Sequence, residues 1–138
     1  MCSERSRLKA VCIDCGEPAS LARWWADVLE WRVRPYSDED LTWLHDHGYE
    51  GPGDDPAVAV DPPDGAGPTL WFNRVPEPKI AKNRVHLDVY AEVDDLQAKG
   101  ASVLYGHGEQ PDTDWAVLTD PEGNEFCVFR RDEVSLKP

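Results

Sequence analysis

Residues 8–31, LKAVCIDCGEPASLARWWADVLEW, contain the change of hydrophobic period on which the fold assignment depends. Apolar and polar side chains roughly alternate up to Asp14, which is the pattern of a half-buried strand. Pro18 suits the first turn of a helix, because the N–H that proline lacks would be unpaired there. Apolar residues then recur at spacings of three and four, which predicts an amphipathic helix with one buried face made of Leu21, Trp24, Trp25, Val28 and Leu29.

Outward from this stretch, the same order of elements is predicted twice. Module one, about residues 8–75, continues with strands at 31–35, 57–60 and 69–75. It also carries an inserted helix at 37–48, whose inner face is expected to hold Leu41, Leu44 and His45. Module two, about residues 84–131, has strands at 84–90, 101–105, 115–119 and 125–130 and a helix at 93–99. An internal repeat of this length indicates two modules that complete one another, and we expect them to form a single domain over 1–138.

The two modules also agree in detail. Ile13-Asp14 before the first helix matches Leu87-Asp88 before the helix of module two. Pro63-Asp64-Gly65 precedes the last strand of module one, and Pro121-Glu122-Gly123 precedes the last strand of module two. The predicted class is therefore α+β, with two βαβββ modules.

At these residues the chain resembles the glyoxalase-like domain branch of the vicinal oxygen chelate superfamily, which includes glyoxalases, bleomycin-resistance proteins and extradiol dioxygenases. The resemblance is carried by four segments in the expected order: IDCGEPASLARWWADVLEW, DPPDGAGPTLWFNRVPEPK, KNRVHLDV and VLTDPEGNEFCVF. It implies a cupped mixed β-sheet, with the helices packed outside and a shared cavity inside. Such a scaffold hosts many chemistries, so the resemblance predicts the fold more sharply than the reaction.

The resemblance also implies where a metal would bind. Metal-dependent members place ligands on the first and last strands of their modules, and the last-strand ligand is normally a glutamate three residues after the asparagine of the terminal turn. That position is Cys127 here, and the position opposite His86 in module one is Cys12. Only His86 matches a family ligand position, so we expect no metal cofactor, with a divalent metal as the alternative.

Strand alternation gives a candidate pocket face from the residues themselves, because every second side chain points the same way. This face is polar, ionisable and aromatic, as a ligand site requires. We assign catalysis to His86 and Glu125. The ligand-binding candidates are Cys12, Asp14, Trp71, Asn73, Asp88, Trp115 and Cys127.

His86 can be read as a general base, a metal ligand or a hydrogen-bond donor to a substrate, or as a buried histidine bonded to Asp88. Glu125 and Asp88 can be read as a carboxylate pair for acid–base work, or as partners of Arg84 and Arg130. Trp71 and Trp115 are candidates for stacking on a flat ligand. The residue types alone leave these alternatives open.

The cysteines allow two further interpretations. Cys12 and Cys15 form a C-x-x-C, but no second pair at suitable spacing completes a zinc site, and alternation sends the two thiols to opposite faces. Cys12 and Cys127 could instead join His86 and Glu125 in a soft site for zinc or copper(I).

Composition excludes several classes of function. The chain has 138 residues, with 27 acidic and 14 basic side chains and a net charge of −13. Such a charge repels phosphate backbones and anionic lipid, so neither nucleic acid nor a membrane is an expected partner. No apolar run reaches the roughly 20 residues that cross a bilayer, and residues 1–10 lack a secretory signal pattern. We therefore expect a cytoplasmic protein with reduced cysteines.

Three functions are compatible with these observations. The first is a small-molecule-binding protein without the standard metal site, acting by sequestration or weak acid–base catalysis. The second is a metal-dependent lyase, isomerase or dioxygenase with an altered ligand set. The third is a structural or protein-binding module, which the polar pocket face disfavours. We expect a small organic molecule as ligand and a homodimer, because exposed strand edges invite pairing.

Overall fold

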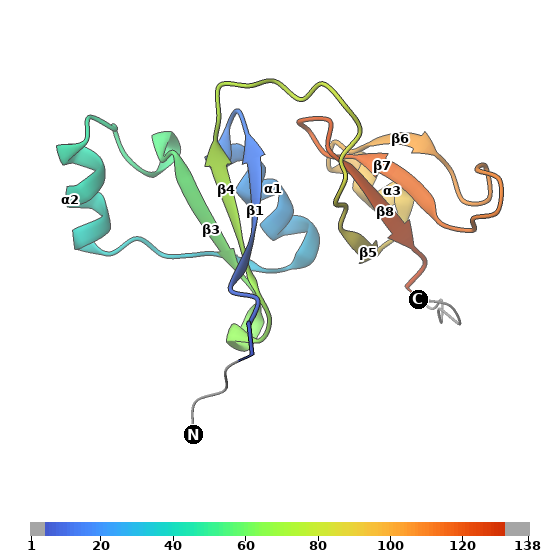
Figure 1. Cartoon of the computed structure of the whole chain (residues 1–138), viewed down its shortest axis with the longest axis horizontal. Coiled ribbons are helices and arrows are strands. Elements are labelled where there is room, and N and C mark those ends of the chain that lie inside the picture. Colours follow the sequence, from blue (N-terminus) through green and yellow to red (C-terminus); the bar gives the residue numbers. More distant parts are fainter. Residues whose placement is uncertain (1–4, 132–138) are drawn as a thin grey trace. The chain divides into compact units, whose positions relative to one another are not determined.

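The computed structural model describes residues 5–131 and contains eight β-strands and three α-helices. The chain forms two compact units, one ending at Pro78 and the other beginning at Lys79 (Figure 1). Each unit holds one βαβββ module, so the predicted repeat and the α+β class are confirmed. None of the helices in this part of the chain has the length and apolar character needed to cross a membrane.

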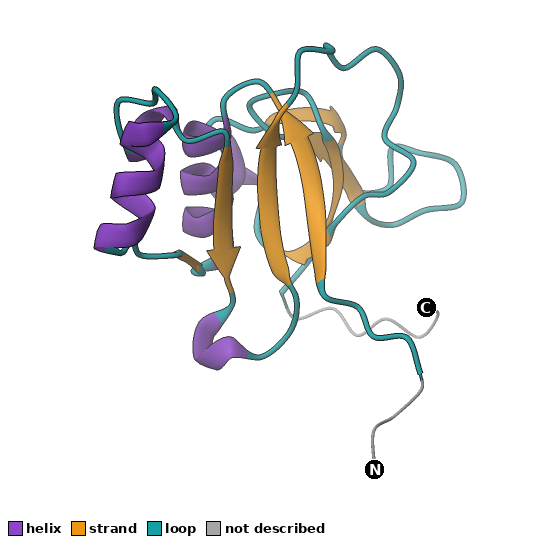
Figure 2. Cartoon of the chain, turned by 60° about the vertical axis from the view of Figure 1, so that its left-hand side comes forward, coloured by secondary structure: helices purple, strands orange, loops and turns teal. Residues whose placement is uncertain are grey.

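Unit 1 is built on a four-stranded mixed sheet in the order β1-β4-β3-β2, shown in orange in Figure 2. β1 runs parallel to β4, and the other neighbours are antiparallel. Two 3-10 turns, Pro52–Asp54 and Pro63–Gly65, flank β3. The strands are β1 (Ala10–Cys15), β2 (Arg32–Val33), β3 (Ala57–Asp61) and β4 (Thr69–Arg74).

The helix α1 (Pro18–Leu29) packs against β3 and β4. Pro18 lies in its first turn, as predicted, and the helix ends at Glu30, which adopts a left-handed conformation with φ 56°. Leu21 and Trp25 are buried, at 1% and 2% exposure. Trp24, Val28 and Leu29 are only partly buried, so the buried face of the helix is narrower than the sequence predicts. The small side chains of Ala22 and Ala26 take up the rest of the buried face.

The predicted insertion helix is α2 (Asp38–Asp46), and Ser37 caps it. The Ser37 hydroxyl accepts from the Asp40 amide at 3.0 Å, and the Asp40 carboxylate accepts from the Ser37 amide at 2.8 Å. This reciprocal pair satisfies two amides that would otherwise lack partners. Leu44 is buried as predicted, but Leu41 and His45 are exposed, so the inner face of this helix is narrower than predicted.

Unit 2 repeats the strand order as β5-β8-β7-β6, again with its first and last strands parallel. The predicted tight turn between β7 and β8 is confirmed: Asp120 accepts from the amides of Glu122 and Asn124, and Gly123 takes a positive φ of 86°. The elements are β5 (Asp88–Tyr90), α3 (Val93–Ala98), β6 (Ser102–Tyr105), β7 (Ala116–Thr119) and β8 (Glu125–Phe129).

One predicted strand is shorter than expected. Residues 84–87 precede β5 instead of belonging to it, and Val85 is 76% exposed. β5 is an edge strand with β8 as its single neighbour. The chain before β5 is held by a side-chain contact instead of by strand pairing. There the Glu125 carboxylate accepts from the Asn83 amide at 3.0 Å. His86 therefore lies outside the regular strand on which the alternation argument placed it.

Candidate functional site

The four predicted ligand-binding residues of unit 1 lie on one face of its sheet. Cys12 pairs with Trp71 and Asp14 pairs with Asn73 in the parallel register of β1 and β4. Antiparallel pairing adds Ala59 beside Trp71 and Ala57 beside Asn73 to the same face. Alternation is thus confirmed within this unit. It also separates the two thiols of the C-x-x-C, because Cys12 is exposed and Cys15 is buried.

In unit 2, Asp88 and Cys127 are register partners on β5 and β8. Burial raises the pKa of the Cys127 thiol to about 11, and the charge of Asp88 together with a hydrogen bond from the thiol to its carboxylate acts in the same direction. Cys127 is therefore a protonated thiol at neutral pH. This arrangement suits packing and hydrogen bonding better than nucleophilic chemistry, which requires a thiolate.

Glu125 is held in an ion pair. Its Oε1 lies 2.7 Å from Lys79 Nζ and accepts the Asn83 amide at 3.0 Å. Burial acts to raise the pKa of Glu125, but these hydrogen bonds outweigh it and lower the pKa to about 2. The sequence-based alternative of an arginine partner is corrected to Lys79. A carboxylate with so low a pKa is a poor general acid at neutral pH.

The remaining predicted residues of unit 2 lie apart from this pair. His86 is exposed in the segment before β5. Trp115 lies immediately before β7 and packs on Phe129, with ring centroids 5.5 Å apart. Its role as a stacking platform, and the assignment of the two modules' candidates to one shared cavity, stay predictions.

The two donors of unit 2 described above already have partners. The Cys127 thiol bonds Asp88, and Glu125 is paired with Lys79 and Asn83. Catalytic metals take about three protein ligands with available lone pairs. Within residues 5–131, no three His, Cys, Asp or Glu side chains gather in a way that could hold a metal ion.

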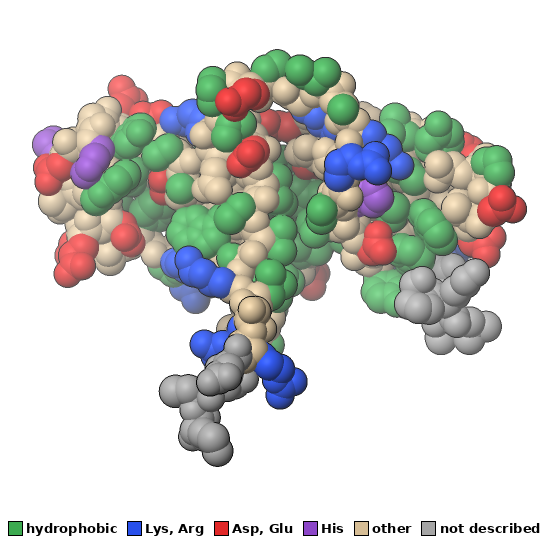
Figure 3. Space-filling model, viewed as in Figure 1, with side chains coloured by type: hydrophobic (Ala, Val, Ile, Leu, Met, Phe, Trp, Pro, Cys, Tyr) green, Lys and Arg blue, Asp and Glu red, His purple; other side chains and the backbone are tan. Residues whose placement is uncertain are grey.

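A cavity of about 220 Å³ opens on the polar face of the unit 1 sheet. Trp71, predicted as a stacking residue, lines it together with Ala57 and Ala59. α2 adds Trp43 and Leu44, and acidic and hydrophobic side chains lie next to one another over this helix in Figure 3. The rest of the lining is Arg34, Pro35, Tyr36, Asp40, Asp55 and Pro56.

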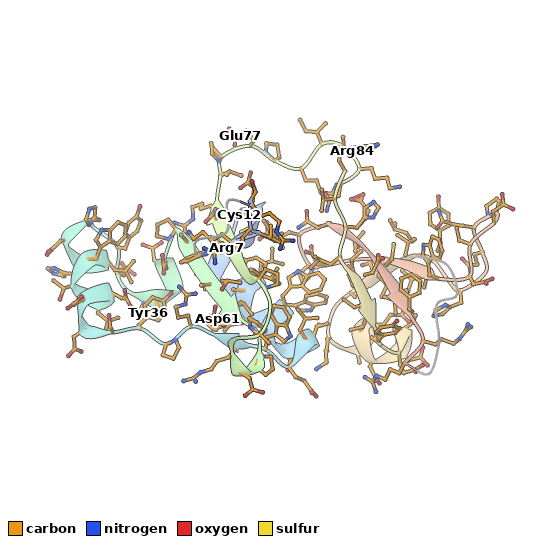
Figure 4. All side chains as sticks on the ribbon, turned by 60° about the horizontal axis from the view of Figure 1, so that its bottom comes forward. Arg7, Cys12, Tyr36, Asp61, Glu77 and Arg84 are labelled. Carbon is orange, nitrogen blue, oxygen red and sulfur yellow. The ribbon has the colours of Figure 1, made fainter. Side chains whose placement is uncertain are left out.

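Tyr36 and Asp55 form the inner polar pair of this cavity. The Tyr36 hydroxyl donates to Asp55 Oδ2 at 2.6 Å, and Asp55 Oδ1 accepts from the Ala57 amide at 2.9 Å. Burial, then the hydrogen bond to Asp55, raises the pKa of Tyr36, so the hydroxyl remains a donor. Asp55 is itself 8% exposed. In Figure 4 Tyr36 lies on the segment that leads from β2 to α2.

Arg34 is fixed in place at the cavity by Asp61 at the end of β3, labelled in Figure 4. Arg34 Nε and Nη2 each donate to one Asp61 oxygen at 2.9 Å, and the Thr69 hydroxyl donates to Asp61 at 2.6 Å. The hydrogen bond to Asp61, with the charges of Asp61 and Asp40, raises the pKa of Arg34. The guanidinium carbon lies 5.2 Å from the centre of the Trp71 ring, which is a cation–π distance.

Sequence reasoning found Trp71 but missed Arg34, Tyr36, Trp43 and Asp55. Asp40, which both caps α2 and lines the cavity, was not predicted as a site residue either. The available signal was the inserted helix itself. A segment present in only one of two repeated modules is a natural place for a feature that the other module lacks.

The fold recurs in solved structures of low sequence identity. A glyoxalase/bleomycin resistance protein/dioxygenase family enzyme from Burkholderia phytofirmans PsJN is 18% identical, with a TM-score of 0.58, covering 89% of this chain and 97% of its own. TioX from Micromonospora sp. ML1 is 17% identical, with a TM-score of 0.52 and coverages of 91% and 99%. A putative glyoxalase family protein from Bacillus anthracis is 17% identical, with a TM-score of 0.51 and coverages of 93% and 97%. These similarities concern the fold alone.

Comparison with curated proteins gave no match. The sequence profile of the glyoxalase-like domain matches residues 10–129, from the start of β1 to the end of β8. That range includes both βαβββ modules, and it agrees with the resemblance found in the four sequence segments. The chain therefore belongs to the glyoxalase-like domain family, within the vicinal oxygen chelate superfamily.

Proposed function

We propose that this protein binds a small organic molecule in the cavity of unit 1, and that it acts by holding that molecule. The observation that carries the proposal is the lining of the cavity, where two tryptophan rings accompany a small number of fixed polar groups. Ligand sites combine apolar walls with a few oriented polar groups in this way.

Binding is favoured over catalysis by the state of the ionisable groups. Cys127 is a protonated thiol, Glu125 is ion-paired, and Tyr36 is held as a donor to Asp55. General acid–base chemistry needs a group whose pKa lies near the working pH. Weak catalysis by His86 belongs to the same proposal as a secondary activity.

We propose the cytoplasm as the location. The supporting observation is that Cys127 is a protonated thiol, a form that a reducing compartment preserves.

The test uses 2-phenylethanol as a neutral probe and protein labelled with ¹⁵N at the tryptophan indoles. The probe is expected to shift the Trp71 indole signal. Trp71→Ala should weaken binding by about tenfold, because an aromatic contact contributes about 0.5–1.5 kcal/mol beyond its buried area. Trp71→Phe, which keeps a ring, should retain most of the affinity.

Trp24→Ala is the matched control, because Trp24 lies on α1 and does not line the cavity, and it should leave binding unchanged. Equal losses in Trp24→Ala and Trp71→Ala would contradict a site at this cavity. The same protein, purified without chelator, should contain no stoichiometric metal by mass spectrometry. One metal held per chain and lost in His86→Ala would favour the metal-dependent alternative instead.

A further inference from the structure

We infer that the cavity of unit 1 selects small aromatic cations, meaning a single ring that carries a protonated amine on a short side chain. This inference rests on the proposed function and names its ligand class. It is carried by the cavity's size, by the balance of fixed charges around it, and by its two tryptophan rings.

The size limits the ligand to about one ring. Sites for drug-sized ligands measure about 300–1,000 Å³, which exceeds the 220 Å³ found here. An apolar cavity of about 150 Å³ is large enough to hold benzene. The additional space in this cavity therefore suits a single ring with a substituent of a few atoms.

Among the residues that the structure describes, Arg34 is the one cation lining the cavity, and it already has its counter-ion. Both oxygens of Asp61 accept from Arg34, at 2.9 Å each, and Asp61 is oriented further by Thr69. An anionic ligand would have to compete with this bidentate pair, whose geometry is that of the stronger type of ion pair. Arg34 is thus poorly suited to recruit a carboxylate from solution.

Two carboxylates of the lining have neutral donors as their partners. Asp55 accepts from the Tyr36 hydroxyl and the Ala57 amide, and Asp40 accepts from the Ser37 amide. Within the described part of the chain, neither forms an ion pair with Lys or Arg. Asp40 nevertheless acts electrostatically on both Arg34 and Tyr36, which places its charge at the cavity.

These groups leave the cavity with excess negative charge. Arg34 contributes one positive charge, against negative charges on Asp40, Asp55 and Asp61. The net charge of −13 on the whole chain adds an attractive field for a cation. A ligand ammonium would be attracted by the charges at the cavity and by the net charge of the chain, whereas a carboxylate would be repelled by both.

The tryptophan rings suit the same ligand. The Arg34 guanidinium lies 5.2 Å from the centre of the Trp71 ring, so this ring already takes part in a cation–π contact. Trp43, from α2, is 49% exposed and stacks on His47 with ring centroids 4.0 Å apart, which orients its ring. An aromatic ammonium could use one ring for stacking and the other for a cation–π contact.

The experiment compares three probes of similar size: phenethylamine as the cation, 2-phenylethanol as the neutral analogue and 3-phenylpropionate as the anion. Affinities are measured from the tryptophan indole signals at low ionic strength. Phenethylamine should bind about tenfold or more tightly than 3-phenylpropionate, with the alcohol between them. Asp40→Asn should weaken phenethylamine binding by about three- to tenfold and leave the alcohol unchanged, while its amide oxygen can still accept from the Ser37 amide.

Asp38→Asn is the matched control, because it removes the same charge from the same helical turn without lining the cavity. It should change phenethylamine binding less than twofold. The inference about charge is overturned if the alcohol or the anion binds as tightly as the amine, or if both variants weaken amine binding equally. Either result leaves the proposal that the cavity binds a small molecule unaffected. If none of the probes perturbs the Trp71 signal, the proposed function fails, and the inference fails with it.

Discussion

Single side chains in this protein are often held by one well-placed partner, and Glu125 is the clearest case in unit 2. Its carboxylate is 12% exposed and receives both the Lys79 ammonium and the Asn83 amide on one oxygen. Lys79 also donates to the Ala81 carbonyl. These bonds tie residues 79–83 to the start of β8, although that segment belongs to no strand.

The Glu125 interaction predicts a pH dependence of stability. Its pKa in the folded protein, about 2, lies below the ordinary value of 4.5, so ionised Glu125 stabilises the fold above pH 4.5. That contribution is lost as the pH falls from 4.5 towards 2. Glu125→Gln should therefore lower the melting temperature at about pH 7, and its difference from wild type should shrink at about pH 3.

Thermal unfolding followed by circular dichroism measures this effect. Glu50→Gln, at an exposed position of unit 1, serves as the control and should match wild type at both pH values. A difference between Glu125→Gln and wild type that is the same at both pH values would show that the charge of Glu125 is irrelevant to stability.

The sequence predicts where a side chain lies when a regular period governs it. Cys12, Asp14, Trp71 and Asn73 share one face because strand side chains alternate strictly. No such rule connects Tyr36 with its partner Asp55. They are 19 residues apart, and each lies outside the regular elements. Their contact depends on the path of irregular backbone, for which a single sequence has no period.

At the scale of elements, α1 stabilises unit 1 through a few deeply buried side chains. Leu21, Ala22 and Trp25 are at most 2% exposed, while Trp24 lies edge-on to Trp25 at a centroid distance of 5.0 Å and is partly exposed. The buried residues of the helix thus lie between Pro18 and Ala26, ahead of its last three residues. The hydrophobic period identifies the inward face, but the depth of each residue depends on how the helix axis crosses the sheet.

Two substitutions on the same helix test this gradient. Leu21→Ala should cost about 2–5 kcal/mol of unfolding free energy, the usual range for truncating a fully buried leucine. Leu29→Ala makes the same chemical change at a partly buried position and should cost less than about 2 kcal/mol. Both are measured by urea denaturation, and equal costs would contradict the observed gradient of burial.

The type and order of the helices and strands could be predicted from the sequence, but the residues at which they begin and end could be predicted less well. Eight strands and three helices follow the predicted order, because hydrophobic period, proline and glycine mark each change. The strand expected at 84–90 is the main exception. Its residues continue an alternating pattern, but the ladder with β8 begins only at Asp88, opposite Cys127.

At the scale of the whole molecule, the repeated module is the organising feature. Each unit arranges its four strands so that the first and last are parallel neighbours. This order leaves two edge strands in each sheet, and edges present unpaired N–H and C=O groups that can join another chain. β6 is such an edge, and it exposes Leu104 and Tyr105 at 49% and 45%.

We expect a homodimer in solution, measured by sedimentation velocity over a wide range of concentration. Leu104→Glu should shift the population towards monomer, because a buried charge at a pairing edge is unfavourable. Leu41→Glu, which adds the same charge at an exposed position of α2, should leave the population unchanged. Sedimentation of wild type as monomer at every concentration would contradict this expectation.

The insertion between β2 and β3 has a consequence for how this protein could change over time. Residues 35–56 contribute most of the cavity lining in one continuous segment, while the sheet contributes small side chains and Trp71. Such an arrangement separates the part of the gene that encodes ligand preference from the part that encodes folding. Recombination or loop exchange in this segment could therefore alter what is bound while leaving the duplicated framework intact, a route to new specificity that point mutation alone would take more slowly.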